Sequence, residues 1–458
     1  MLAQLSVSFV HDLAGYDEAW QIGVKRSITH RRQEVINTEP MKIFRPPHLV
    51  GVMWKTVSED CNLACDYCYY SRIGGKIEGK IKRIDGDVLK KFIGEYMELS
   101  HGVAAFVWQG GEPLLAGLDF FRDVTALQAK YAPPHTLISN AVQTNATLLT
   151  DEMARFFKRY NFLLGVSVDG PREIHNARRV SRSGHGSFDR VMKGIQLLRK
   201  YGVDFNIITV LHKGNVNRAA DLMEFFQAEA FQYLQFIPGM DFLAQQPGKP
   251  PRYLISAEEY AEFMCQVFDL WYNEANPKMS IRFFDNMLRV YLNREAELCA
   301  HRETCPTTLV LQQNGDAYPC DFYISEEYRL GNVGQDSLTA ILQNHVRHRF
   351  LSQKPRLPKP CGTCEFLRLC HGGCPRNRRW RMSEEEVDVD YFCESYRKVY
   401  TYTHERMERL AERTREVWLR EYRDRGHKAR ERNQPCICGS GLAYKNCCGV
   451  VEGQFSLR

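Results

Sequence analysis

The stretch CNLACDYCYY, residues 61–70, carries three cysteines, Cys61, Cys65 and Cys68, in the spacing Cys-x3-Cys-x2-Cys. Soft thiolate ligands of this kind select iron–sulfur clusters or zinc. A cube of four irons that is held by three thiolates keeps one iron open for chemistry. A structural zinc ion needs a fourth ligand, which this stretch does not supply nearby. Half of a zinc site, completed from elsewhere in the chain, is therefore the alternative.

The composition is that of an intracellular enzyme. The chain has 458 residues, of which 44% are hydrophobic and 25% are charged, enough for a large core and about two or three domains. Residues 1–16 lack the pattern of a signal peptide, and apolar stretches such as 162–168 are too short to cross a bilayer. We therefore expect a cytoplasmic protein, without a membrane partner, whose sixteen cysteines mainly bind metal.

After the three cysteines, apolar stretches with strand-like and helix-like spacing alternate. The spacing predicts strands at 104–107, 136–143, 162–168, 205–210 and 233–237, and helices at 88–99, 119–131, 150–160, 188–201 and 219–230. A repeated βα unit requires a parallel sheet with right-handed crossovers, as an open sheet or a partial barrel. In either form, ligands bind at the carboxyl ends of the strands.

Polar residues recur where these predicted strands end. Gly110 and Gly111 leave a bare backbone that can approach an ammonium group, and Glu112 beside them is a possible acceptor. Later strand ends carry groups suited to ribose hydroxyls and a carboxylate, namely Asn145, Ser167, Asp169 and Arg179. Ordinary turn chemistry is the alternative for each residue taken singly. Their recurrence after successive strands favours a binding site.

The motifs CNLACDYC, WQGGEP, QTNATLL and VSVDGP, in that order, resemble those of radical S-adenosylmethionine (SAM) enzymes over about residues 48 to 240. The resemblance implies a partial (β/α)6 barrel of the TIM type, with the strand-end residues above as SAM contacts. It also implies a [4Fe-4S] cluster on Cys61, Cys65 and Cys68, whose open iron is chelated by SAM. Cleavage of SAM would give a 5′-deoxyadenosyl radical that abstracts a hydrogen atom from the substrate.

A second set of eight cysteines lies between residues 299 and 393, and eight thiolates are what two fully ligated four-iron clusters need. The block CGTCEFLRLCHGGC, residues 361–374, resembles the SPASM extension of radical peptide-modifying enzymes. By this resemblance, the first auxiliary [4Fe-4S] cluster would be held by Cys299, Cys305, Cys320 and Cys374. The second would be held by Cys361, Cys364, Cys370 and Cys393. Spacing alone also fits zinc ribbons with four cysteines each.

The segment NGDAYPCDFYISEEYRLGN, residues 314–332, resembles the anaerobic sulfatase-maturating enzymes, which oxidise a sulfatase cysteine or serine to formylglycine (3-oxoalanine). Asp321 matches the family's proposed general base, which takes the SH or OH proton once a hydrogen atom has left Cβ. A turn carboxylate is the alternative. Tyr70 matches a substrate-side tyrosine, with a core aromatic as the alternative.

The family resemblance also implies partners: an unfolded or nascent sulfatase with a Cys/Ser-x-Pro-x-Arg segment, and an electron donor such as ferredoxin or flavodoxin. Two other functions stay open. One is a maturase that forms thioether or carbon–carbon cross-links on a ribosomal peptide. The other is a non-catalytic iron–sulfur or zinc scaffold, which would not require the intact motif at Gly110, Gly111 and Glu112.

The composition changes beyond Cys393. Residues 396–425 predict a charged amphipathic helix, and its interleaved acids argue against a nucleic-acid partner. The segment RNQPCICGSGLAYKNCCG, residues 432–449, then resembles the SEC-C motif of the preprotein translocase ATPase. That resemblance implies a docking role for a protein partner. Four thiolates in so short a segment predict a structural zinc knuckle on Cys436, Cys438, Cys447 and Cys448.

These observations divide the chain into six segments. We expect an N-terminal extension without an assigned role at 1–47, the radical SAM partial barrel at 48–240, a helical connection at 241–298, the SPASM auxiliary-cluster domain at 299–395, the charged helix at 396–430 and the SEC-C-like motif at 431–458.

Overall fold

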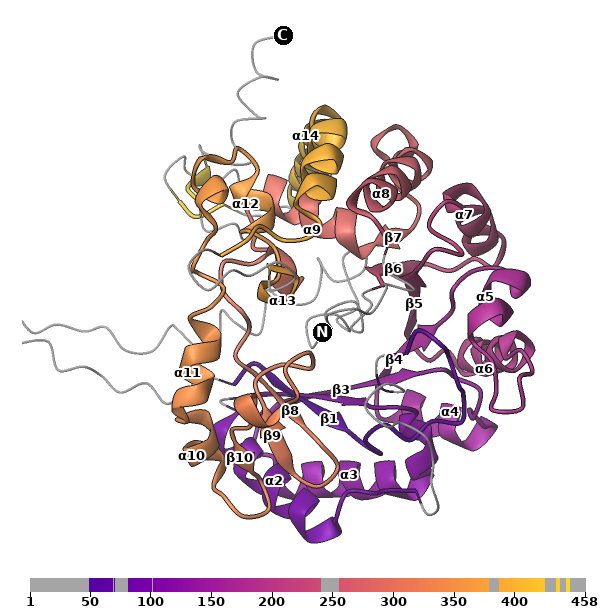
Figure 1. Ribbon diagram of the computed structural model, residues 1–458, viewed down its shortest axis with the longest axis vertical. Helices are drawn as coiled ribbons and strands as arrows, with labels where there is room; N and C mark the ends of the chain where they lie inside the picture. Colours follow the sequence, from indigo (N-terminus) through magenta and orange to yellow (C-terminus); the bar gives the residue numbers. More distant parts are fainter. Residues whose placement is uncertain are drawn as a thin grey trace, which may run out of the picture.

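The computed structural model describes residues 49–68, 70, 81–100, 102–239, 255–378, 387–424, 434–436 and 442–444. In this part of the chain the strands form one curved sheet, and helices cover its outer face (Figure 1). No helix of the described residues is long and apolar enough to cross a membrane.

Six parallel strands, adjacent in chain order, form the barrel portion of the sheet. They are β1 (Gly51–Lys55), β2 (Val103–Gln109), β3 (Leu137–Thr144), β4 (Leu163–Ser167), β5 (Phe205–Leu211) and β6 (Tyr233–Pro238). The helices of this portion are α2 (Gly86–Leu99), α3 (Leu118–Tyr131), α4 (Asp151–Arg159), α5 (Arg172–Arg178), α6 (Phe188–Tyr201) and α7 (Ala219–Ala228). The predicted partial (β/α)6 barrel is confirmed, whereas β1 and α5 were not identified as elements from the sequence pattern.

Side-chain caps define where several of these helices begin. The Asp85 carboxylate accepts from the backbone N–H groups of Asp87 and Val88 at the start of α2. Thr150 accepts from the N–H of Met153 at the start of α4. Such side-chain acceptors satisfy donors that have no partner within the helix, so these boundaries follow directly from residue type.

Four short strands extend both edges of the sheet beyond the predicted barrel. They are β7 (Ser280–Ile281), β8 (Thr308–Leu311), β9 (Asp316–Tyr318) and β10 (Gly331–Asn332). Strand β7 pairs parallel to β6 at one edge. At the other edge β8 pairs parallel to β1, and the antiparallel strands β9 and β10 follow. The cysteine-rich segment is thus hydrogen-bonded directly to the first barrel strand.

The remaining helices pack beside this edge and against the sheet's last strands (Figure 1). They are α8 (Ala257–Tyr272), α9 (Arg282–Tyr291), α10 (Leu338–Leu342), α11 (His345–Leu351), α12 (Leu367–Cys370), α13 (Pro375–Arg378) and α14 (Cys393–Asp424). Helix α14 covers the predicted charged helix up to Asp424, the last described residue there, and packs against α8 and α9. Its predicted apolar face is buried at Met407, Leu410 and Trp418. One hydrophobic core runs from the barrel through these helices.

Substitution of Phe121 tests the packing of helices on the barrel. Phe121 is fully buried, and its ring lies 5.4 Å from that of Phe157 and 6.1 Å from that of Phe162. Phe121→Ala should destabilise the fold by about 3–5 kcal/mol, because it leaves a cavity among aromatic rings. We expect a lower melting temperature by circular dichroism. Leu137→Ala, at a side chain that is 51% exposed, should change it little; equal losses would contradict this account of the core.

Candidate cofactor and active site

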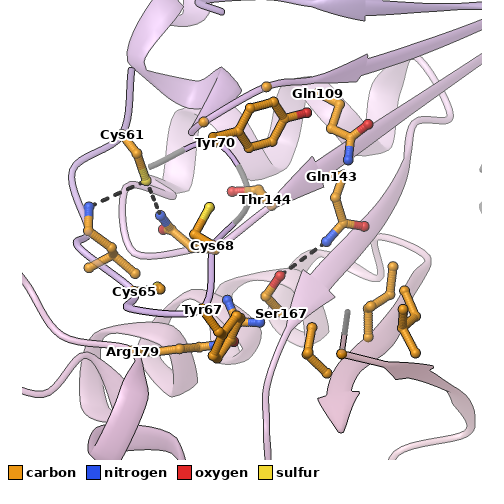
Figure 2. A pocket seen from close by; sticks show the side chains of 18 of the residues that line it. Cys61, Cys65, Tyr67, Cys68, Tyr70, Gln109, Gln143, Thr144, Ser167 and Arg179 are labelled. Atoms are coloured by element: carbon orange, nitrogen blue, oxygen red, sulfur yellow. Dashed lines mark hydrogen bonds between the residues drawn. The ribbon is translucent and has the colours of Figure 1, made fainter. Parts of the chain in front are cut away.

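A cavity at the carboxyl ends of the barrel strands brings together most of the predicted cofactor contacts (Figure 2). It is lined by Cys61, Cys65, Cys68, Tyr70, Gly110, Gly111, Asn145, Ser167 and Arg179. Glu112 and Asp169 are also nearby, but both are fully buried and do not line the cavity. The sequence therefore predicted which residues gather at this end of the barrel. The structure shows that most of them face the cavity, whereas Glu112 and Asp169 lie behind it.

Gly110 and Gly111 bring the cysteine loop close to the end of β2. The N–H of Gly111 donates to the carbonyl of Ser58, and the N–H of Glu112 donates to the carbonyl of Asp60, each at 2.8 Å. A Cβ atom at Gly111 would lie 2.0 Å from the Asp60 carbonyl oxygen. Glycine is required here because two backbone segments touch, in addition to any approach by a ligand.

Glu112 supports the next strand end from behind the cavity. Its carboxylate accepts from the N–H of Asn145 at 2.8 Å and from the Thr144 hydroxyl at 2.7 Å. Burial raises the pKa of Glu112 to about 7, although these hydrogen bonds favour the ionised form. Asn145 in turn directs its side-chain amide toward the Cys61 sulfur, at 3.8 Å. Glu112 therefore acts on the cavity through Asn145.

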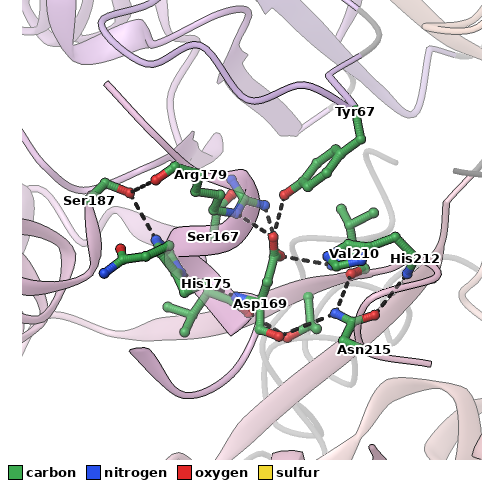
Figure 3. A network of polar contacts seen from close by, with 12 residues as sticks. Tyr67, Ser167, Asp169, His175, Arg179, Ser187, Val210, His212 and Asn215 are labelled. Atoms are coloured by element: carbon green, nitrogen blue, oxygen red, sulfur yellow. Dashed lines mark hydrogen bonds and ion pairs between the residues drawn. The ribbon is translucent and has the colours of Figure 1, made fainter. Parts of the chain in front are cut away.

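Asp169 is the centre of a second buried network (Figure 3). Its carboxylate accepts from Arg179 Nε at 2.8 Å and Nη2 at 3.1 Å, and also from the hydroxyl of Tyr67. Burial alone would raise the pKa of Asp169, but the Arg179 guanidinium outweighs it and holds that pKa below its usual value. Arg179 and Tyr67 both line the cavity. Asp169 thus positions the two side chains that a ligand would touch.

Three further cavity residues, Tyr67, Gln143 and His212, were not predicted as site residues. The N–H of Gly214 donates to His212 Nδ1 at 3.0 Å, and no hydrogen-bond partner among the described residues reaches His212 Nε2. Gln143 donates to the Ser167 hydroxyl at 3.2 Å, while its buried Oε1 has no partner within the described part. Buried polar atoms normally have partners, so this cavity fits a polar ligand such as SAM.

A second cavity borders the first, and Phe322 lines both. It brings together the four predicted ligands of the first auxiliary cluster, with Asp321 beside them. These ligands are Cys299, Cys305, Cys320 and Cys374. The donor set suits a four-iron cluster, because thiolates are the ligands that such clusters select.

The second predicted auxiliary set is also gathered. Cys361 raises the thiol pKa of Cys370, and both raise that of Cys393, in each case after burial as the larger cause. Cys364 likewise acts on Cys361 and Cys370. The cysteines that the structure describes form no disulfide bonds with one another.

The C-terminal motif is described in part. Cys436 and Tyr444 pack with Trp418 of α14 and with Leu292, which follows α9. The other predicted zinc ligands, Cys438, Cys447 and Cys448, lie outside the described residues.

Lys55 connects the two cavities and was also missed. It ends β1, its side chain is fully buried, and it forms an ion pair with Asp321. It also donates to the Tyr70 hydroxyl and, at 3.2 Å, to Gln109 Oε1. Burial lowers the pKa of Lys55, and Asp321 partly offsets this effect. Tyr70 and Asp321, predicted from segments about 250 residues apart, are thus joined through one ammonium group.

Asp169→Asn tests the positioning network. Breaking a buried ion pair costs about 3–5 kcal/mol, so we expect Arg179 and Tyr67 to lose their orientation and the SAM dissociation constant to rise about tenfold or more. Equilibrium dialysis with anaerobically reconstituted protein measures it. Asp189→Asn removes the partner of Arg172 in a pair whose side chains are 71% and 57% exposed, and should have little effect. Equal effects of the two substitutions would reject the role of Asp169.

Comparison with protein families identifies three regions. Residues 56–226 match the radical SAM superfamily, residues 299–365 match an iron–sulfur cluster-binding domain known as SPASM, and residues 432–449 match the SEC-C motif.

Characterised relatives cover most of the chain. The cysteine-type anaerobic sulfatase-maturating enzyme of Clostridium perfringens (strain 13 / Type A) is 34% identical over 371 residues, 80% of this chain and 99% of the relative. The serine-type enzyme of Bacteroides thetaiotaomicron is 37% identical over 361 residues, 75% of this chain and 87% of the relative. The solved structure of native anSMEcpe with bound AdoMet superposes with a TM-score of 0.74 at 32% identity, covering 79% of this chain and 99% of that one. The chain therefore belongs to the anaerobic sulfatase-maturating enzymes of the radical SAM superfamily.

Proposed function

We propose that this protein oxidises a cysteine or serine side chain of a sulfatase to formylglycine. As a radical SAM enzyme with a SPASM region, it binds SAM and iron–sulfur clusters. The observation that supports the specific reaction is the position of Asp321. This carboxylate lies beside the second cavity, is paired with Lys55, and is connected through Lys55 to Tyr70 of the first cavity.

The finer cofactor assignment is also a proposal. Cys61, Cys65 and Cys68 would hold the cluster that cleaves SAM, and the two later sets of four cysteines would each hold an auxiliary [4Fe-4S] cluster. When bound, SAM and its cluster supply a 5′-deoxyadenosyl radical that removes a hydrogen atom from the substrate Cβ. Around SAM, Arg179 and Ser167 would bind polar groups of the cofactor, and Tyr67 and His212 would enclose it.

Asp321 would take the proton of the substrate SH or OH as the carbon–heteroatom double bond forms. Its ion pair with Lys55 fixes the direction of the carboxylate, because both side chains are buried, at 3% and 0% exposure. Tyr70, held by the same ammonium group, would contact the substrate from the SAM side. Fixed orientation of a base contributes to catalysis since the reacting atoms need not be brought into line in each turnover.

The partners follow from the proposed reaction. The substrate would be an unfolded or nascent sulfatase presenting a Cys/Ser-x-Pro-x-Arg segment, and a solved relative, anSMEcpe, has been captured with a bound peptide. Reduction of the first cluster would require a donor such as ferredoxin or flavodoxin, and the proposed compartment is the cytoplasm. The SEC-C motif would hold zinc and dock a protein partner.

An anaerobic peptide assay tests the function. The protein is reconstituted with iron and sulfide and given SAM, a reductant and a peptide with a Cys-x-Pro-x-Arg or Ser-x-Pro-x-Arg core. We expect deoxyadenosine, together with a peptide aldehyde that is identified by its mass and by hydrazine trapping. Deoxyadenosine with a cross-linked peptide and no aldehyde would replace this function with the cross-linking alternative.

Asp321→Asn separates proton removal from radical formation. We expect cofactor cleavage to continue while aldehyde yield falls about 100-fold or more, since positioned general bases contribute about 10²–10⁴-fold. Glu327→Gln, at an exposed carboxylate of the same segment, is the matched control and should retain the wild-type yield. Full aldehyde yield from Asp321→Asn would remove this residue from the mechanism.

A further inference from the structure

Lys354 is a buried cation at the first auxiliary site that no motif predicted. It follows α11, and its side chain is completely buried. Its ammonium group donates to the carbonyl of Ala300 at 3.0 Å and to that of Gly373 at 2.5 Å. These carbonyls belong to the residues directly beside Cys299 and Cys374. Lys354 therefore connects two ligand segments that are about 75 residues apart in the sequence.

The charge of Lys354 acts mainly on cysteines, although the Asp390 carboxyl also interacts with it without forming an ion pair. Among the residues that the structure describes, no Asp or Glu forms an ion pair with it. Its leading electrostatic partners are the thiolates of Cys374, Cys305 and Cys299, all from the first auxiliary set. Burying an ammonium group away from water is costly unless an anion lies near it. A cluster held by four thiolates carries net negative charge and supplies that anion.

A buried carboxyl group, Asp390, acts on both auxiliary sets. It is 3% exposed and accepts from the backbone N–H groups of Cys374 and Phe392, both at 2.8 Å. It raises the thiol pKa of Cys374 in the first set and of Cys361, Cys370 and Cys393 in the second, in each case after burial.

Arg378 also acts on both sets. It interacts with Cys361 of the second set and with Cys374 and Cys305 of the first. Its guanidinium group is held by four backbone carbonyls. Lys354 is therefore the charge that distinguishes the two sets, because its contacts are with the first.

We propose that Lys354 is a positioning residue that raises the reduction potential of the cluster on Cys299, Cys305, Cys320 and Cys374 above that of the second auxiliary cluster. Reduction adds one electron, so a cation held in a region of low dielectric constant stabilises the reduced form more than the oxidised form. The proposal rests on the cofactor assignment above.

This difference in potential selects the first electron acceptor of the proposed reaction. After hydrogen abstraction the substrate carbon carries one unpaired electron. That electron would pass to the cluster held by Cys299, Cys305, Cys320 and Cys374, which would be reduced by one unit, while the SH or OH proton would go to Asp321 and the C=S or C=O bond would form. A thioaldehyde then exchanges sulfur for oxygen with water and releases hydrogen sulfide. Asp321 directly follows the cluster ligand Cys320, so proton and electron leave the substrate toward the same side of the site.

A redox titration tests Lys354. In a background with alanine at Cys61, Cys65 and Cys68, only the two auxiliary clusters remain, and titration monitored by electron paramagnetic resonance gives their two midpoint potentials. Lys354→Gln keeps N–H donors and removes the charge. We expect it to lower the higher midpoint by about 59 mV or more, a tenfold weaker one-electron reduction, while the lower midpoint moves less. Lys354→Arg should restore most of the difference.

Lys359→Gln is the matched control, because Lys359 is an exposed cation two residues from Cys361. Water and salt screen an exposed charge, so both midpoints should remain unchanged. The proposal would be overturned if Lys354→Gln binds the wild-type amount of iron and leaves both midpoints unaltered, or shifts both equally. Lys354 would then only hold the two ligand segments together.

Asp390→Asn supplies a second test that does not depend on the folding of a Lys354 variant. Asparagine keeps an acceptor oxygen for the Cys374 and Phe392 N–H groups and removes a charge that acts on both sets, so we expect both midpoints to rise. Unchanged midpoints would show that these buried charges do not set the two potentials and would overturn the proposal. The peptide assay and the redox titration test different claims. If the peptide aldehyde forms but the midpoints do not shift, only the role of Lys354 is rejected. If the midpoints shift but no aldehyde forms, only the proposed reaction is rejected.

Discussion

The buried ion pair between Lys55 and Asp321 is the contact on which the arrangement of the two cavities depends. Lys55 is the last residue of β1, and Asp321 follows Cys320 in the cysteine-rich segment. Water cannot solvate either charge, so loss of one partner leaves the other uncompensated. The parallel pairing of β1 with β8 sets the position from which the chain reaches Asp321. Barrel and auxiliary region therefore meet at two neighbouring cavities that Lys55 connects.

Buried charges of both signs are distributed across this shared region. Lys55 lies near Cys68 of the first predicted cluster site and Cys320 of the next, and Lys354 interacts with the other cysteines of that second site. Asp390 acts on cysteines of the second and third predicted sites. Each of these groups is anchored by hydrogen bonds or an ion pair, so its field is fixed before any cofactor binds. Such preorganisation is the general way in which proteins tune bound clusters.

The sequence predicts the features that arise from local pattern. Alternating periodicities predicted the parallel barrel, and the resemblance to SPASM regions implied groups of cysteines that the structure brings together, such as Cys299 with Cys374. Lys55 and Lys354 could not be found in this way, because a single lysine at the end of an apolar strand or after a short helix resembles a surface residue. Their burial results from tertiary pairing. The β8 strand was missed for the same reason: TLVL is too short to show a period.

The pairing of β1 with β8 also limits where the chain can be truncated without exposing the sheet. Strand β1 is buried along its whole length and reads GVMWK, and β8 satisfies the backbone groups on one side of it. A fragment that ends before the cysteine-rich segment would expose those groups along an apolar edge, which is a template for intermolecular strand pairing. The auxiliary region thus covers an edge of the barrel that would otherwise be open to strand pairing. In this fold, the segment that gathers the later cysteines also protects the first strand from aggregation.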